Sequence, residues 1–177
     1  MKLFRIAALF FGLAPAAPVA AQECQTLSEL HAGQTARVLA SVVRDCVSKK
    51  RYENAIEMFW AYSNFSLYDQ QRVWDESAHV AVQELHGWIF SGYSFDRLNA
   101  LKAEIARLRE PDSPFLEATC RAVAQAGPPN YRPTYMIKRG MMPRKTDDDW
   151  QTQAFDSRAA WQKALVEING CPIDVLN

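Results

Sequence analysis

The sequence lacks several features that would place it directly in a functional class. Lysine and arginine together number 20, as do aspartate and glutamate, so there is no broad excess of positive charge for nucleic acid or anionic lipid. No CxxC pair and no GxSxG motif occurs, which leaves no sign of a thioredoxin-like redox centre or of a hydrolase nucleophile elbow. No segment alternates polar and apolar residues as a half-buried strand does.

The first 21 residues have the parts of a secretory signal peptide. Lys2 and Arg5 form a basic start, residues 6–14 are uncharged and apolar, and small residues precede Gln22, which predicts cleavage before Gln22. The apolar run is too short for the about 20 residues that cross a bilayer. Cys24 follows Glu23 rather than the small residue that lipidation requires. We therefore expect an exported, soluble periplasmic protein without membrane insertion.

The chain that remains after cleavage, 22–177, has the size of one domain with one core. Removal of residues 1–21 takes away two cations and no anion, which leaves 18 lysines and arginines against 20 aspartates and glutamates. This near-neutral charge again argues against a nucleic-acid partner.

The four cysteines all follow the signal peptide. An even number in an exported chain predicts two disulfides, which can pair in three ways. Pairing Cys24 with Cys46 and Cys120 with Cys171 closes the shortest loops and costs the least entropy. One unbroken helix between the first two cysteines would hold them roughly 30 Å apart, so this pairing requires a break at Gly33.

Helical periodicity dominates the rest of the chain, since apolar residues recur at steps of three and four. Six helices are expected, beginning after Gly33, near Tyr52, at Trp74, after an N-cap at Ser94, at Pro114 after Ser113, and among Asp147–Asp149. The buried stripe of the third is expected to be Trp74, Ala78, Ala81, Leu85 and Trp88. The last helix is expected to carry Trp150, Ala154 and Trp161 and to end at Gly170. The prediction is an all-α, single-domain bundle of about six helices with one long ordered loop.

That loop, residues 127–146, contains four prolines that exclude helix over most of its length. A short extended piece is expected at Tyr135–Ile137. Loops of this length are usually functional or disordered, and aromatic residues and methionine here favour order. Two interpretations stay open: the loop packs over the bundle, or it forms a recognition surface. Tyr, Met and Arg are enriched at interface cores, and the candidate partner-binding residues are Tyr131, Tyr135, Met136, Arg139, Met141, Met142 and Arg144.

Candidate sites for metal ions are weak. His79 and His86 are seven residues apart, about 10 Å along a helix, which is too far for one ion. Asp75 has the right spacing from His79, but a third ligand would have to come from another element. Asp147–Asp149 lack the alternating spacing and glycine of a calcium loop. We expect no metal and no cofactor.

Catalytic groups cannot be assembled into a complete set. Carboxylates such as Asp75, Glu76 and Glu84 could serve a small periplasmic hydrolase, but any helical protein offers such pairs. Residues 50–56 resemble the first half of a tetratricopeptide unit without a second copy, which leaves a tetratricopeptide-like envelope adaptor as another alternative. Binding rather than catalysis, with no catalytic residues, is the favoured hypothesis.

The loop also carries a resemblance. Its string Tyr131-x-Pro133-x-Tyr135-Met136-Ile137-x-x-Gly140-Met141 resembles one in exported proteobacterial proteins, several of which are similar to periplasmic immunity proteins of type VI secretion effectors. The resemblance covers this string and the general plan of signal peptide, helices and disulfides. It implies a small periplasmic protein that binds and neutralises a toxin delivered by neighbouring cells, without a cofactor. It transfers no residue roles.

Overall fold

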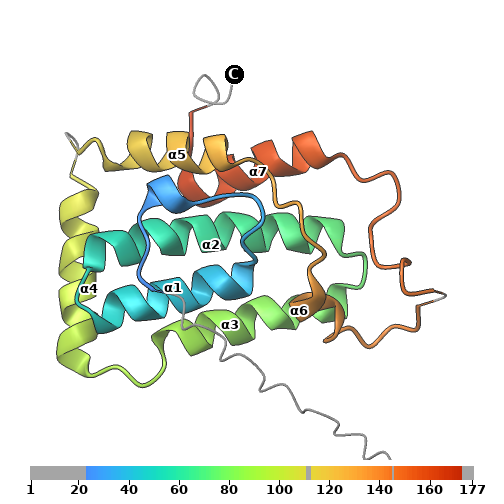
Figure 1. Cartoon of the computed structure of the whole chain (residues 1–177), viewed down its shortest axis with the longest axis horizontal. Helices are drawn as coiled ribbons and strands as arrows, with labels where there is room; N and C mark the ends of the chain where they lie inside the picture. Colours follow the sequence, from blue (N-terminus) through green and yellow to red (C-terminus); the bar gives the residue numbers. More distant parts are fainter. Residues whose placement is uncertain (1–22, 111–112, 145, 173–177) are drawn as a thin grey trace, which may run out of the picture.

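Helix α2, Tyr52–Arg72, runs through the middle of the molecule, as the computed structural model in Figure 1 shows. The structure describes residues 23–110, 113–144 and 146–172; the predicted signal peptide and its cleavage point at Gln22 lie outside them. Helix α1 and helix α3 lie below α2 in this view, α5 and α7 lie above it, and α4 crosses one end (Figure 1). The other helices are α1 Ala36–Ser48, α3 Val80–Phe90, α4 Phe95–Leu108, α5 Phe115–Ala126, α6 Thr134–Ile137 and α7 Ser157–Asn169, with 3-10 helices η1 Leu27–Glu29 and η2 Glu76–His79.

The all-α prediction is confirmed for the described part of the chain, which has seven α-helices and no strand. The main core forms around α2, which contacts α1, α4, α5 and α7. Phe65 of α2 is completely buried, and its ring meets that of Trp161 of α7 edge to face at 5.6 Å. Aromatic pairs of this geometry stabilise beyond their buried area. None of the described helices is both long and apolar enough to pass through a bilayer.

Helix starts follow local capping chemistry. The side chains of Thr35, Ser94 and Asp156 each accept a hydrogen bond from a backbone N–H in the first turn of α1, α4 and α7. Such a bond satisfies one of the free donors at a helix start. The predicted N-cap at Ser94 is therefore confirmed. Gly170 ends α7 in the left-handed conformation, at φ 64°, as predicted from its place after the last apolar residue.

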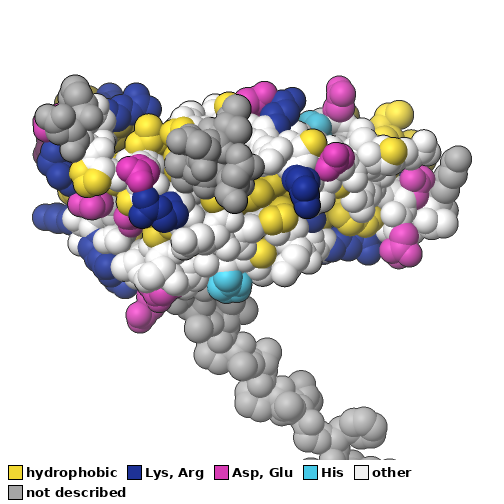
Figure 2. All heavy atoms as spheres, turned by 90° about the horizontal axis from the view of Figure 1, so that it is seen from above, with side chains coloured by type: hydrophobic (Ala, Val, Ile, Leu, Met, Phe, Trp, Pro, Cys, Tyr) yellow, Lys and Arg dark blue, Asp and Glu magenta, His cyan; other side chains and the backbone are white. Residues whose placement is uncertain are grey.

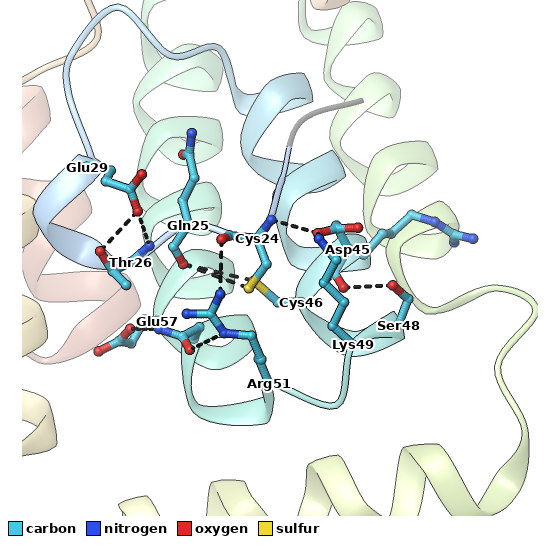
Figure 3. The surroundings of a disulfide bond; sticks show 12 residues. Cys24, Gln25, Thr26, Glu29, Asp45, Cys46, Ser48, Lys49, Arg51 and Glu57 are labelled. Atoms are coloured by element: carbon cyan, nitrogen blue, oxygen red, sulfur yellow. Dashed lines mark hydrogen bonds and ion pairs between the residues drawn. A yellow bond between two sulfur atoms is a disulfide. The ribbon is translucent and has the colours of Figure 1, made fainter. Parts of the chain in front are cut away.

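Both predicted disulfides are present: Cys24 pairs with Cys46 and Cys120 with Cys171. The break that the first pair requires lies between η1 and α1, where Gly33 sits in a turn. In Figure 3 the backbone around Cys24 is held from two sides: its N–H donates to Asp45 Oδ2 at 2.6 Å, and its carbonyl accepts from Arg51 at 3.3 Å. Two disulfides indicate an oxidising compartment outside the cytoplasm.

Three sequence predictions about helices are wrong. Tyr135–Ile137 belongs to the helical turn α6 instead of an extended piece. Trp74 precedes both η2 and α3, so residues 74–90 do not form one helix. The last helix begins at Ser157, so it does not contain Trp150 or Ala154. The backbone of residues 150–152 instead forms hydrogen bonds with the end of α2: Trp74 N donates to Trp150 O at 3.2 Å, and Thr152 N donates to Arg72 O at 2.8 Å.

The buried position predicted for Trp88 is also wrong. The sequence pattern predicts it on the buried stripe of the third helix, but its side chain is 43 % exposed. The buried residues of α3 are Ala81, Leu85 and Ile89, which recur at steps of four. Apolar residues occur around most of α3, so the spacing alone did not distinguish Ile89 from its neighbour Trp88.

Candidate protein-binding surface

The long loop is anchored on a buried ion pair at the end of α2. Asp69 is fully buried, and its Oδ1 accepts hydrogen bonds from Arg72 Nε at 2.9 Å and Nη2 at 2.6 Å. Its Oδ2 accepts from the hydroxyls of Tyr131 at 2.8 Å and Tyr135 at 3.0 Å. Both carboxylate oxygens are thus satisfied, which a buried charge requires. Burial raises the Asp69 pKa, and Arg72 opposes this effect.

The two tyrosines act as donors in this cluster. Burial, together with the nearby Asp69 carboxylate, raises the pKa of Tyr131 and of Tyr135 well above the ordinary value. Their hydroxyls therefore stay protonated. The Tyr131 hydroxyl also accepts a hydrogen bond from Ala36 N at 3.0 Å, in the first turn of α1. One side chain of the loop thus joins the start of α1 to the end of α2.

Aromatic rings surround the guanidinium of Arg72. Its Cζ lies 5.1 Å from the ring centroid of Tyr68, 5.0 Å from that of Tyr131 and 5.7 Å from that of Trp150. Cation–π contacts of this kind are strongest where water is excluded, and Arg72 is 5 % exposed. The rings come from α2, the loop and the segment before α7, so this one cation holds three parts of the chain together.

A second anchor lies at the other end of the loop. Asp75 Oδ2 accepts from Met142 N at 3.0 Å, and Ser77 Oγ accepts from Met141 N at 2.8 Å. Asp75 Oδ1 accepts from both the backbone and the hydroxyl of Ser77. Burial raises the Asp75 pKa, but the hydrogen bonds outweigh it and the pKa lies below the ordinary value. Gly140 passes so close to Asp75 that a Cβ atom there would overlap the carboxylate.

These anchors divide the predicted partner-binding residues into two groups. Met136 is completely buried against Val73, Ala78 and Ala81, and Tyr131 and Tyr135 are partly buried with their hydroxyls on Asp69. This first group packs and orders the loop. The second group faces outward: Met141 is 82 % and Met142 56 % exposed, and the side chains of Arg139 and Arg144 are exposed.

A shallow cleft of about 190 Å³ lies between α3 and the outward part of the loop. Its lining residues are Arg37, Ala81, Glu84, Leu85, Trp88, Tyr135 and Arg139. Arg139 of the loop forms an ion pair with Glu84 of α3 across it, with Nη2 and Oε2 2.5 Å apart. The cleft therefore brings two of the predicted partner-binding residues, Tyr135 and Arg139, together with a face of α3 that the sequence pattern did not indicate. Met142 and Arg144 line a separate hollow beside Asp75 and Trp150.

Trp88 is the largest exposed side chain of this cleft, and it is held in place. The Arg44 guanidinium lies 4.6 Å from its ring centroid and donates hydrogen bonds to the carbonyls of Ile89 at 3.4 Å and Ser91 at 3.1 Å. Arginine at a helix C-terminus is favoured because it meets carbonyls that lack helical partners. A Trp that is exposed but restrained offers a contact that loses little entropy on binding.

Four of the candidate metal and carboxylate residues have other contacts: His79, His86, Asp75 and Glu84. His79 Nε2 donates to Val73 O at 3.1 Å, while His86 packs edge to face on Phe59 and Phe90. In the described part of the chain, no three His, Cys, Asp or Glu residues come together where they could hold a metal ion. Asp75 binds the loop backbone and Glu84 binds Arg139, as described above. Glu76 is exposed in η2.

Comparisons with known proteins do not identify a role for these residues. Models of protein families, curated protein sequences and solved structures were each compared with the chain, and none of them matches it.

Proposed function

We propose that this protein is a periplasmic inhibitor that binds an envelope-acting toxin, of the kind delivered by type VI secretion, and neutralises it by direct contact. We place the contact on the surface formed by α3 and residues 138–144, which we call the α3–loop face. The observation that carries the proposal is Trp88, which is 43 % exposed and yet restrained by Arg44.

Neighbouring residues support this choice of surface. Met141 and Met142 are the most exposed methionines of the described chain, and Arg139, two residues before Met141, pairs with Glu84 of α3. Trp, Arg and Met side chains are enriched in interface cores relative to the rest of the protein surface. The loop that presents them is ordered by Asp69 and Asp75, so its docking loses less conformational entropy than that of a free loop.

The test is protection of cells. The full chain is expressed in the periplasm of a host that also exports the product of the gene next to its own, the candidate toxin. Survival and binding by calorimetry are measured for the wild type, for Trp88→Ala and for Arg139→Glu. We expect each variant to lose at least about 2 kcal/mol of binding free energy, as hot-spot truncations do, with unchanged helical circular dichroism.

Val166→Ala is the matched control, because Val166 is an exposed apolar residue, 41 % exposed, on α7, which lies on the opposite side of α2 from α3 (Figure 1). It should bind and protect like the wild type. Full protection by both α3–loop variants would move the interface elsewhere, and absence of protection by the wild type would contradict the inhibitor function itself.

A further inference from the structure

The cleft of the α3–loop face has a charge and a shape that select its occupant. We infer that it receives an acidic segment of the partner protein, with an Asp or Glu side chain on Arg37 and an adjacent apolar side chain against Trp88. This inference rests on the proposed function and names the chemistry of the partner. At about 190 Å³, the cleft is smaller than the 300–1,000 Å³ typical of small-molecule sites, which favours side chains of a protein segment over a whole ligand.

Of the two cations that line the cleft, Arg37 is the one without a partner among the described residues. Within the described residues its side chain is exposed and forms no hydrogen bond or ion pair. Arg139, in contrast, is already neutralised by Glu84 at 2.5 Å. A carboxylate that enters the cleft therefore meets Arg37 without displacing another anion. Rim charges of this kind set the specificity and the rate of association.

Among the ionic side chains that line the cleft, the cations Arg37 and Arg139 outnumber the anion Glu84. Arg44 adds a further cation on the ring of Trp88, and Lys138 is exposed next to Arg139 in the loop. The chain as a whole has equal numbers of cationic and anionic residues, so this local excess comes from how the fold distributes them. The face of α5 and α7, seen from above in Figure 2, mixes both signs with hydrophobic side chains. The excess of cations among the lining residues of the cleft favours an acidic occupant.

The apolar part of the site lies beside these cations. Ala81 and Leu85 of α3 line the cleft together with the rings of Tyr135 and Trp88. Leu85 is 8 % exposed, and the Tyr135 hydroxyl donates to Asp69, which fixes the direction of its ring. An apolar residue next to the acidic one would cover Trp88, whose position Arg44 already restricts.

The test uses blocked peptides and the folded, disulfide-bonded protein. An acetylated and amidated peptide of sequence leucine–glutamate–leucine is titrated into nitrogen-15-labelled protein, and the indole N–H signal of Trp88 is followed, assigned by its loss in Trp88→Phe. We expect a saturable shift of this signal. The same peptide with glutamine in place of glutamate should bind at least about tenfold more weakly, and rising salt should reduce this difference.

Arg37→Ala should bind the glutamate and glutamine peptides equally. Arg158→Ala is the matched control, since Arg158 of α7 is likewise exposed and unpaired among the described residues; it should keep the wild-type preference. Equal binding of both peptides to the wild type, or no shift of the Trp88 signal, overturns the inference. So does tighter binding of a glutamine peptide with a free terminal carboxylate than of the blocked glutamate peptide, because the site would then select a chain end.

The two proposals can fail separately. A specific glutamate-dependent shift at Trp88 without protection from the toxin supports the acidic occupant and contradicts the inhibitor function. Protection that depends on Trp88 and is unaffected by Arg37→Glu supports the inhibitor function and overturns the acidic occupant.

Discussion

Gly140 and Asp75 approach each other so closely that a Cβ atom at residue 140 would lie 2.2 Å from Asp75 Oδ2, so the carboxylate would have to move. The same Asp75 Oδ2 accepts the Met142 N–H at 3.0 Å. The turn after α6 and the segment before η2 are thereby joined, and Met141 and Met142 are turned toward the solvent.

Replacement of Gly140 tests this contact. Gly140→Ala should lower the free energy of unfolding by about 1–3 kcal/mol, because the added methyl group must displace the Asp75 carboxylate. Gly87→Ala is the control: a Cβ at Gly87 in α3 would meet nothing within 4 Å, and alanine is favoured over glycine in a helix by up to about 1 kcal/mol. Urea unfolding measures both, and equal stability of the two variants would contradict the close approach.

Removal of the Tyr131 hydroxyl tests the loop anchor on α2. Tyr131→Phe deprives buried Asp69 of one donor and the Ala36 N–H of its acceptor, so we expect a loss of about 1–3 kcal/mol in unfolding free energy. Tyr52→Phe serves as the comparison, since the Tyr52 hydroxyl has no hydrogen bond among the described residues, and it should change stability by less than about 0.5 kcal/mol. Similar losses in both variants would mean that the Asp69 cluster does not stabilise the loop.

Two tryptophans with different exposure provide a third test. Trp161 is 7 % exposed in the core, and its replacement by alanine should cost about 3–5 kcal/mol. Trp88→Ala should cost less than about 1 kcal/mol, because the side chain is 43 % exposed and its main contact is the cation–π pair with Arg44. Thermal unfolding followed by circular dichroism separates the two; a large loss for Trp88→Ala would place this ring in the core after all.

The disulfides give a fourth prediction. Thiol titration of the unfolded, unreduced protein should find no thiol in the chain. In the chain-entropy description, a disulfide stabilises more when it closes a longer loop. The Cys120–Cys171 bond, with a separation of 51 residues, should therefore contribute about 0.7 kcal/mol more than the Cys24–Cys46 bond, with a separation of 22. The double variant Cys120→Ala with Cys171→Ala should therefore be less stable than Cys24→Ala with Cys46→Ala. The reverse order would indicate that local contacts, such as the hydrogen bond from Cys24 N to Asp45, determine how much each disulfide stabilises more than loop length does.

Features that depend on neighbouring residues could be predicted from the sequence. Ser94 caps α4 because its side chain reaches a backbone N–H three residues away, and Gly170 ends α7 because its left-handed conformation suits glycine. The disulfide pairing also followed from short loop closure. The start of α7 was missed because Asp147–Asp149 resemble a helix start locally, whereas the backbone after them bonds to residues 72–74, far away in the sequence.

The candidate binding surface shows the same difference between what neighbouring residues determine and what distant contacts determine. From the sequence alone, Tyr131, Tyr135 and Met136 look like interface residues, because composition identifies side chains that favour contact without naming the partner. In the folded chain the two hydroxyls bond to Asp69, more than sixty residues earlier, and Met136 packs on Val73 and Ala81. Composition and periodicity by themselves determined an all-α, disulfide-bonded chain with an ordered loop. Only tertiary contacts decided that Trp88, Arg37 and the arginines and methionines of residues 139–144 remain on the surface, because burial depends on which distant segments pack together.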